Sequence, residues 1–185
     1  MAKPSLSHLE DRGVITISGP DGKSFLQGII TKDIKKCTPD NVSFGALLTP
    51  QGKYLFDFFI ATFEDTIILD TERHRIQEFV DRLNKYKLRA KIEIHDESET
   101  YSIFSLFGSN PLNCLSLNPT PGHCIRIGQS YAFTDPRTTE AGARLILRKS
   151  EEKDIISKPI FEYTNKNNYD MHRIKLGLPD SSRDL

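Results

Sequence analysis

The stretch from Ser24 to Ile60 constrains the fold of this chain more than any other part of the sequence. It begins with apolar residues at helical spacing, namely Phe25, Leu26, Ile29 and Ile30. Asp21 stands just ahead of them, and aspartate is a favoured residue type at the start of a helix. The pattern therefore predicts a short helix capped by Asp21.

Two strands follow in the same stretch, at about 42–49 and 54–62. The sequence Pro50-Gln51-Gly52 between them is typical of a turn, because proline fixes φ and glycine tolerates positive φ. Side chains of a strand alternate between its two faces, so one face of the second strand carries Tyr54, Phe56, Phe58 and Ile60. We expect the rest of the chain to pack against this helix and these strands.

The flanking segments complete a recognisable order of elements. A β-branched strand at 13–18 precedes the stretch, and a strand at 66–70 follows it. Thr71 is then expected to cap a second helix, whose apolar face is formed by Ile76, Phe79, Val80 and Leu83. With a strand at 91–95, residues 20–96 read helix–strand–strand–strand–helix–strand, which predicts a ferredoxin-like plan or a close variant.

The acidic, turn-prone segment 96–99 indicates a boundary between two lobes. Beyond it, strands are expected at 100–108, 123–128, 130–133 and 144–149, with a weak helix or turn at 150–154. The sequence thus predicts an α+β protein with two lobes.

Charge is balanced, since 25 lysine and arginine residues stand against 25 aspartate and glutamate residues. Proteins that bind nucleic acid without sequence preference depend on phosphate contacts and carry a basic excess. The balance therefore argues against strong non-specific nucleic-acid binding.

No apolar run approaches the roughly 20 residues that a membrane-spanning helix needs, and the N-terminal segment lacks the apolar core of a secretory signal. Cys37, Cys114 and Cys124 are an odd number of cysteines at irregular spacing, which indicates reduced thiols rather than a disulfide framework. We therefore expect a cytoplasmic protein without membrane association.

Motifs with chemical meaning are few. The histidines and cysteines show no paired ligand spacing, so no metal site is expected, and no Ser/His/Asp arrangement supports a hydrolase. The segment Gly19–Ser24 resembles a phosphate-binding loop but is too short for one. Asp33 and Asp57 lie beside apolar stretches, where a carboxylate either orients an amine-bearing ligand or caps a turn. The aromatic strand 54–60 is also compatible with an RNA-binding module that stacks bases on Phe56 or Phe58.

Five segments, in order along the chain, resemble the YgfZ family, folate-binding relatives of the aminomethyltransferase (T-protein) of the glycine cleavage system. They are Phe25–Gly28 with Thr31–Asp33, Gly45–Lys53, Arg82–Arg89, Asp135–Arg137 with Gly142 and Arg144, and Tyr169 with Arg173–Pro179. The resemblance implies a GcvT/YgfZ-like α+β fold, in which a ferredoxin-like lobe of residues 19–98 is inserted into an antiparallel α+β lobe of residues 1–18 and 99–185. Members of the family run longer and carry a K-G-C-Y-x-G-Q-E loop that has no counterpart before Leu185. We therefore expect this sequence to be an N-terminal portion, a truncated product or a degenerate member of the family.

The resemblance also implies a cofactor site. Tyr169 takes the position of an aromatic residue that lies against the folate in that family. Arg12 stands where the family often has an aromatic residue, and its planar guanidinium suits stacking or pairing with the glutamate tail of folate. Arg173 is a second candidate partner for that carboxylate.

The function implied is that of a tetrahydrofolate-binding accessory protein for assembly or repair of iron–sulfur clusters and for tRNA modification by iron–sulfur enzymes. Its expected partners are folate and iron–sulfur enzymes or their assembly factors. Whether the chain is an enzyme stays open. The alternatives are an aminomethyltransferase-like one-carbon transferase, which requires an acid such as Asp33 or Asp57, and the RNA-binding module described above.

Overall fold

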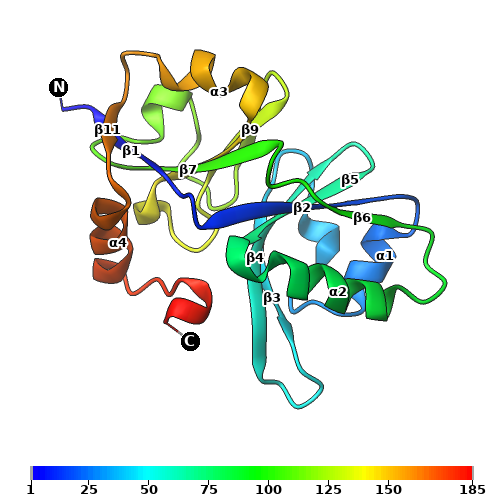
Figure 1. The fold of residues 1–185 in the computed structure, drawn as a ribbon. Coiled ribbons are helices and arrows are strands. Elements are labelled where there is room, and N and C mark those ends of the chain that lie inside the picture. The colour runs from blue at the N-terminus through cyan, green and yellow to red at the C-terminus, as the bar shows by residue number, and fades with distance from the viewer. Residues whose placement is uncertain (1, 185) are drawn as a thin grey trace.

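A computed structural model describes residues 2–184, which form two β-sheets packed face to face with helices on their outer sides (Figure 1). The mixed α+β architecture with two sheets confirms the expected fold class. No helix within residues 2–184 has both the length and the apolar character needed to cross a bilayer.

The first sheet has five antiparallel strands, and α1 (Gly22–Gln27) and α2 (Ile76–Lys87) cover its outer face. In spatial order its strands are β3 (Ser43–Leu48), β4 (Tyr54–Phe63), β5 (Thr66–Glu72), β2 (Arg12–Ser18) and β6 (Glu93–Asp96). The order β4-β5-β2-β6, with a helix after β2 and another after β5, is the ferredoxin-like arrangement, and β3 extends it by one edge strand. The expected plan is therefore confirmed.

The second sheet has six strands and carries α3 (Lys149–Ile156) on its outer side. In spatial order the strands are β11 (Glu162–Thr164), β1 (Pro4–His8), β7 (Tyr101–Gly108), β10 (Ala143–Arg148), β9 (Ser130–Thr134) and β8 (Cys124–Ile127). β1 and β11 pair in parallel, and the other neighbours are antiparallel. The strands expected between residues 100 and 149 are confirmed, whereas β1, β11 and α4 (Lys166–Lys175) were not predicted.

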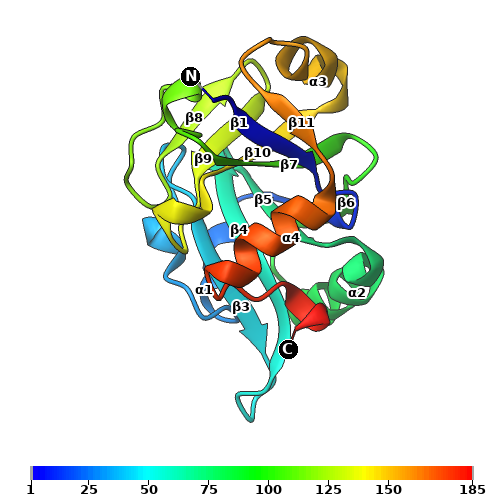
Figure 2. The ribbon, with the colours of Figure 1, turned by 90° about the vertical axis from the view of Figure 1, so that its left-hand side faces the viewer.

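Short 3-10 turns complete the chain, at Ile34–Lys36, Arg73–Arg75, Asn113–Leu115, Thr139–Ala141 and Ser181–Arg183. The last of these, η5, follows α4. Figure 2 shows α4 and η5 lying across the edge where the two sheets meet.

The position of β2 differs from the expected division of the chain into lobes. A boundary at residue 18 would leave β2 in the lobe of residues 1–18 and 99–185, but β2 pairs with β5 and β6 in the five-stranded sheet. The chain passes from one sheet to the other between β1 and β2, because the ferredoxin-like arrangement needs β2 as a central strand. It returns between β6 and β7. The division into two lobes, with β2 moved to the inserted one, remains a prediction.

Aromatic packing on the helix side excludes the RNA-stacking surface. Phe56 and Phe58 are buried, and Phe56 stacks on Phe79 of α2 with ring centroids 4.4 Å apart. The side chains that would have to receive bases therefore form the core of the five-stranded sheet and α2. The RNA-binding alternative is wrong in the residues on which it depended.

Two expected helix caps also differ in the structure. The Asp21 side chain makes no hydrogen bond to α1 and instead accepts one from the backbone N–H of Lys91, at 2.7 Å. Thr71 lies in β5, where its hydroxyl donates to the carbonyl of Asp57, and α2 begins only at Ile76. Both side chains connect segments that are distant in the sequence, and a pattern of local residues does not show such a connection.

Candidate functional site

The space between the two sheets is apolar in its middle and polar at both ends. Along β2, the residues that face this space run Arg12, Val14, Thr16, and along β5 they run Asp70, Ile68, Thr66. On the opposite sheet, β10 repeats the pattern with Arg144, Ile146 and Arg148. Because alternate residues of a strand share a face, each strand contributes one polar group to each end.

One end holds a buried set of ions and hydroxyls that we call the ionic cluster, made of Arg12, Asp57, Asp70, Arg144, Tyr169 and Ser181. Asp70 is at its centre and is fully buried. Its Oδ1 accepts a hydrogen bond from Arg12 Nε at 2.8 Å, and its Oδ2 accepts one from Arg144 Nη1 at 2.6 Å. One carboxylate thus binds an arginine from each sheet.

Tyr169 joins the same cluster from α4. Its hydroxyl accepts a hydrogen bond from Arg144 Nη2 at 3.0 Å, and its ring packs beside Phe107. Two of the residues predicted from the sequence, Arg12 and Tyr169, are therefore connected through Asp70 and Arg144. Neither side chain is exposed, since 6% of Arg12 and 4% of Tyr169 remain accessible.

The charges in the cluster stabilise one another. Burial by itself would raise the pKa of Asp70, but the guanidinium groups of Arg12 and Arg144 outweigh it and hold the pKa of this carboxyl below its ordinary value. Burial likewise opposes the charge on Arg144, yet Asp70 and the other groups around it raise the pKa of this guanidinium. The three groups are therefore ionised throughout the physiological range of pH.

Asp57 lies at the rim of the cluster, beneath η5. Its Oδ1 accepts a hydrogen bond from Ser181 Oγ at 2.5 Å, and Ser181 Oγ accepts one from Arg12 Nη1 at 3.1 Å. Ser181 holds a positive φ of 47°, which is uncommon for a residue other than glycine. A single hydroxyl from the C-terminal turn thus bridges Oδ1 of Asp57 and Nη1 of Arg12.

Two buried polar atoms in this part of the molecule have no hydrogen-bond partner within residues 2–184: the hydroxyl of Tyr54 and Oε2 of Glu72. Burial and the nearby carboxylate of Asp57 raise the pKa of Tyr54 to about 12. Unsatisfied buried groups cost stability unless something binds them, and they often mark a site for a ligand or water.

The ring of Phe59 packs against two guanidinium groups, those of Arg144 and Arg137. The guanidinium carbon of Arg144 lies 4.1 Å from the centroid of this ring, and that of Arg137 lies 4.9 Å away. Arg137 also pairs with Asp135 at 2.8 Å. Planar cations stacked on a ring are held in one orientation.

Arg173 and Asp33 lie apart from these groups. Arg173 donates to Asp170 at 2.7 Å, to the carbonyl of Leu178 and to Asp184, so its guanidinium holds the end of α4 to the C-terminal turn. Asp33 accepts a hydrogen bond from the backbone of Lys35 and caps the turn Ile34–Lys36.

Asp70 and Arg144 are the central residues that the sequence did not single out. Asp70 ends the apolar run Ile67-Ile68-Leu69, and a carboxylate at the end of a buried strand was the available signal. Arg144 was part of a segment quoted for the family resemblance, but it carried no predicted role.

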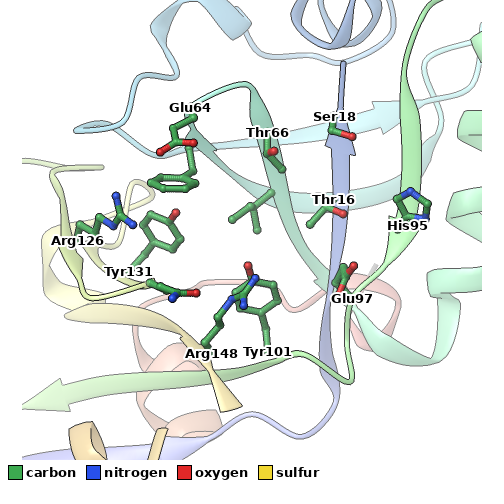
Figure 3. Close-up of a pocket in the computed structure, with 13 residues that line it drawn as sticks. Thr16, Ser18, Glu64, Thr66, His95, Glu97, Tyr101, Arg126, Tyr131 and Arg148 are labelled. Atoms are coloured by element: carbon green, nitrogen blue, oxygen red, sulfur yellow. The ribbon is translucent and has the colours of Figure 1, made fainter. Parts of the chain in front are cut away.

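The other end of the inter-sheet space is open and forms the inter-sheet cavity, with a volume of about 480 Å³. Figure 3 shows Arg126, Arg148 and Tyr131 on one side, and Thr16, Ser18 and Thr66 projecting from β2 and β5 on the other. The apolar middle, including Val14, separates this cavity from the ionic cluster. Residues 2–184 contain no group of three His, Cys, Asp or Glu side chains arranged to hold a metal ion.

Comparison with solved structures supports the fold. The aminomethyltransferase T of the glycine cleavage system from Bartonella henselae superposes with a TM-score of 0.77 at 15% sequence identity, over 96% of this chain and 52% of that protein.

Sequence comparison gives relatives over nearly the whole chain. The mitochondrial "Iron-sulfur cluster assembly factor IBA57 homolog" of Mycosarcoma maydis is 27% identical over 193 residues, covering 97% of this chain and 45% of the relative. The "tRNA-modifying protein YgfZ" of Aliivibrio fischeri is 24% identical over 177 residues, covering 95% and 54%. The chain thus spans about half the length of these curated relatives.

The model of the GCVT N-terminal domain matches residues 5–117, which include Arg12, Asp57 and Asp70 of the ionic cluster. This match covers more than half of the sequence, so the chain belongs to the family of GCVT N-terminal domains.

Proposed function

We propose that this protein binds tetrahydrofolate, or a folate derivative, and acts as an accessory factor in the assembly or repair of iron–sulfur clusters, including those used in tRNA modification. The observation that carries the proposal is the similarity, over almost the whole chain, to relatives named as an iron–sulfur cluster assembly factor and a tRNA-modifying protein. Iron–sulfur enzymes or their assembly factors are the partners that this function requires.

The ionic cluster, together with Tyr54 and Glu72 beside it, is the proposed folate site, and these residues suit the chemistry of a pterin. A pterin carries adjacent N–H donors along one edge, and a carboxylate is the side chain that accepts such donors. Asp57 and the unpartnered Oε2 of Glu72 supply acceptors, while the buried Tyr54 hydroxyl supplies a donor. When bound, the cofactor would supply a one-carbon unit on its reduced pterin ring.

The three residues named from the sequence take different roles in this proposal. Tyr169 supports the site by holding Arg144, and Arg12 meets the ligand only after Ser181 withdraws from its Nη1. Arg173 remains a proposed partner for the glutamate tail, and its bond to Asp184 would have to open first. At both arginines the incoming ligand would replace a contact made by the C-terminal turn.

Titration calorimetry with tetrahydrofolate tests the site. The chain should bind it saturably, Asp57→Asn should weaken binding about tenfold or more because a charged acceptor is lost, and Tyr169→Phe should weaken it less. Asp33→Asn is the matched control, since it removes the same charge from a carboxylate that only caps a turn. Absence of binding by the folded chain, or equal losses in the Asp57 and Asp33 variants, would contradict the proposal.

A second candidate function is aminomethyl transfer, and the buried carboxylate of Asp57 is the observation that favours it. An acid of this kind, next to the reduced pterin, is able to move a proton during one-carbon transfer. The two functions differ in turnover: a transferase consumes an aminomethyl donor in the presence of tetrahydrofolate, whereas an accessory factor only binds the folate. Multiple-turnover assays with wild type and Asp57→Asn discriminate between them.

We also propose the cytoplasm as the site of action, supported by the three free thiols, which are typical of a reducing compartment. The name of the Mycosarcoma maydis relative makes the mitochondrion the alternative. Fractionation of cells that express the tagged full-length protein decides between the two compartments.

A further inference from the structure

The inter-sheet cavity contains two arginines that differ from those of the ionic cluster. In that cluster, Arg12 and Arg144 each pair with a carboxylate. Arg126 and Arg148, by contrast, have no carboxylate oxygen within 4.0 Å of their guanidinium nitrogens anywhere in residues 2–184. Both line the cavity, and the carboxylates that act on them lie beyond that distance, namely Glu97 and Glu151 for Arg148 and Glu151 for Arg126.

The two guanidinium groups lie near aromatic rings. The central carbon of Arg126 is 4.3 Å from the centroid of Phe63, and that of Arg148 is 5.7 Å from the centroid of Tyr101. Arg126 also donates from Nε to the carbonyl of Gly128 at 2.5 Å, which fixes its direction. When the flat face of a guanidinium packs on a ring, the N–H groups at its edge remain able to donate to an oxyanion. Phosphate is an anion whose geometry these groups match well.

Aromatic side chains line the same cavity, and Tyr101 is the more accessible of its two tyrosines, since only 4% of Tyr131 is exposed. Tyr131 and Phe63 meet edge to face, with centroids 5.6 Å apart, and Tyr101 stands near Arg148 (Figure 3). Stacking of a base on an aromatic ring is a recurrent source of affinity in single-stranded nucleic-acid sites. The cavity volume of about 480 Å³ falls within the range of about 300–1,000 Å³ typical of small-molecule sites.

Acidic groups also line the cavity, so a ligand that carries only negative charge does not suit it. Glu97 and Glu64 line the cavity together with the arginines. Oε2 of Glu97 accepts a hydrogen bond from Thr100 Oγ1, and its other oxygen remains for a donor. A ligand that suits both kinds of charge carries an anionic group at one end and N–H donors on a flat ring at the other.

We propose that the inter-sheet cavity binds a guanine mononucleotide, with its phosphoryl group on Arg126 and Arg148, its base against the ring of Tyr101, and the N–H edge of the base toward Glu97. The hydroxyls of Thr16, Ser18 and Thr66 face the same space and suit the ribose and phosphate oxygens. This site is separate from the proposed folate site and does not depend on it.

The first test is titration calorimetry of the chain with guanosine monophosphate, guanosine and ribose 5-phosphate. Saturable binding of the nucleotide, at least about tenfold tighter than binding of either fragment, is expected because each fragment lacks one set of charged hydrogen bonds. No binding of the nucleotide would overturn the proposal. Equal affinity for ribose 5-phosphate would also overturn it, because that result describes a site for a simple phosphate.

Substitutions locate the site. Arg126→Gln and Arg148→Gln should each weaken binding of guanosine monophosphate about tenfold or more, while Arg89→Gln, which removes the same charge from an exposed side chain elsewhere, should leave it unchanged. Thermal unfolding shows whether each variant is folded. Tetrahydrofolate binding should persist in Arg148→Gln, and nucleotide binding should persist in Asp57→Asn. Nucleotide affinity that is unchanged in the double variant of Arg126 and Arg148 would refute the assignment.

Discussion

Asp70 of one sheet and Arg144 of the other form a buried ion pair, with 2.6 Å between Oδ2 and Nη1. Asp70 also binds Arg12, so this carboxylate pairs with two buried guanidinium groups, and Arg12 has a second, weaker partner in Asp180 at 3.5 Å. The carboxylate of Asp70 therefore joins the two sheets at this end.

Replacing that charge should be costly. Asp70→Asn keeps the size of the side chain but leaves Arg12 and Arg144 without their shared carboxylate, so we expect a loss of about 3–5 kcal/mol in the free energy of unfolding. Glu78→Gln, in the exposed pair with Arg75, is the control and should cost less than about 1 kcal/mol. Denaturant titration measures both, and similar losses in the two variants would show that the buried pair has no special weight.

The ionisation of Asp70 should also make the stability of the folded chain depend on pH. The pKa of Asp70 is lowered in the folded chain from an ordinary value of 3.8, so the unfolded chain takes up the proton more readily. The contribution of Asp70 to stability is therefore complete above its ordinary pKa and is lost as the pH falls through the lowered value. The difference in unfolding free energy between wild type and Asp70→Asn should be constant at neutral pH and shrink below about pH 4. A difference that grows as the pH falls would contradict the predicted direction of this pH dependence.

Two glycines give a matched test of space against backbone conformation. Gly52 and Gly142 both have positive φ, of 80° and 88°. A Cβ at Gly52 would meet nothing within 4 Å, whereas a Cβ at Gly142 would lie 2.2 Å from the carbonyl oxygen of Leu106. Gly52→Ala should therefore cost only about 1–2 kcal/mol for the backbone, and Gly142→Ala about 1–3 kcal/mol more for the clash. Thermal or denaturant unfolding gives the comparison, and equal costs would mean that β7 moves away without penalty.

The three thiols should differ in reactivity. Cys37 and Cys124 are buried, and burial raises the pKa of both, that of Cys124 to about 12. Cys114 is only partly covered, although burial raises its pKa as well. Because the thiolate is the reacting form, a disulfide reagent at mildly alkaline pH should modify Cys114 first and the other two only when the chain opens. Cys114→Ser should abolish the fast phase, and a fast phase that survives this substitution would contradict the assignment.

The sequence predicted the fold well wherever elements follow local periodicity. The helices and strands between residues 20 and 96 carry apolar residues at the spacing of their own secondary structure, so the order of these elements could be predicted from the sequence. The missed elements lack that signal. β11 has exposed and half-buried side chains and owes its strand conformation to pairing with β1, and α4 buries only Tyr169 and Arg173.

The candidate site was predictable only in part. Arg12 and Tyr169 were identified through the family resemblance, and the structure brings both into the ionic cluster. Asp57 was considered as an acid but without its partners. Asp70 could not be chosen over other carboxylates, because its role depends on two arginines that lie 58 and 74 residues away in the chain. Such contacts exist only once the two sheets have packed.

The parallel pairing of β1 with β11 has a consequence for biosynthesis. β1 leaves the ribosome before its two neighbours, because β7 and β11 lie at residues 101–108 and 162–164. The five-stranded sheet, in contrast, has all its strands once Asp96 has emerged. Since domains form as their segments become available and pairings between distant segments are slow, the nascent chain should close its ferredoxin-like sheet while β1 is still unpaired. β1 is thus synthesised before β2 but should join its sheet only after β2 has joined the other one.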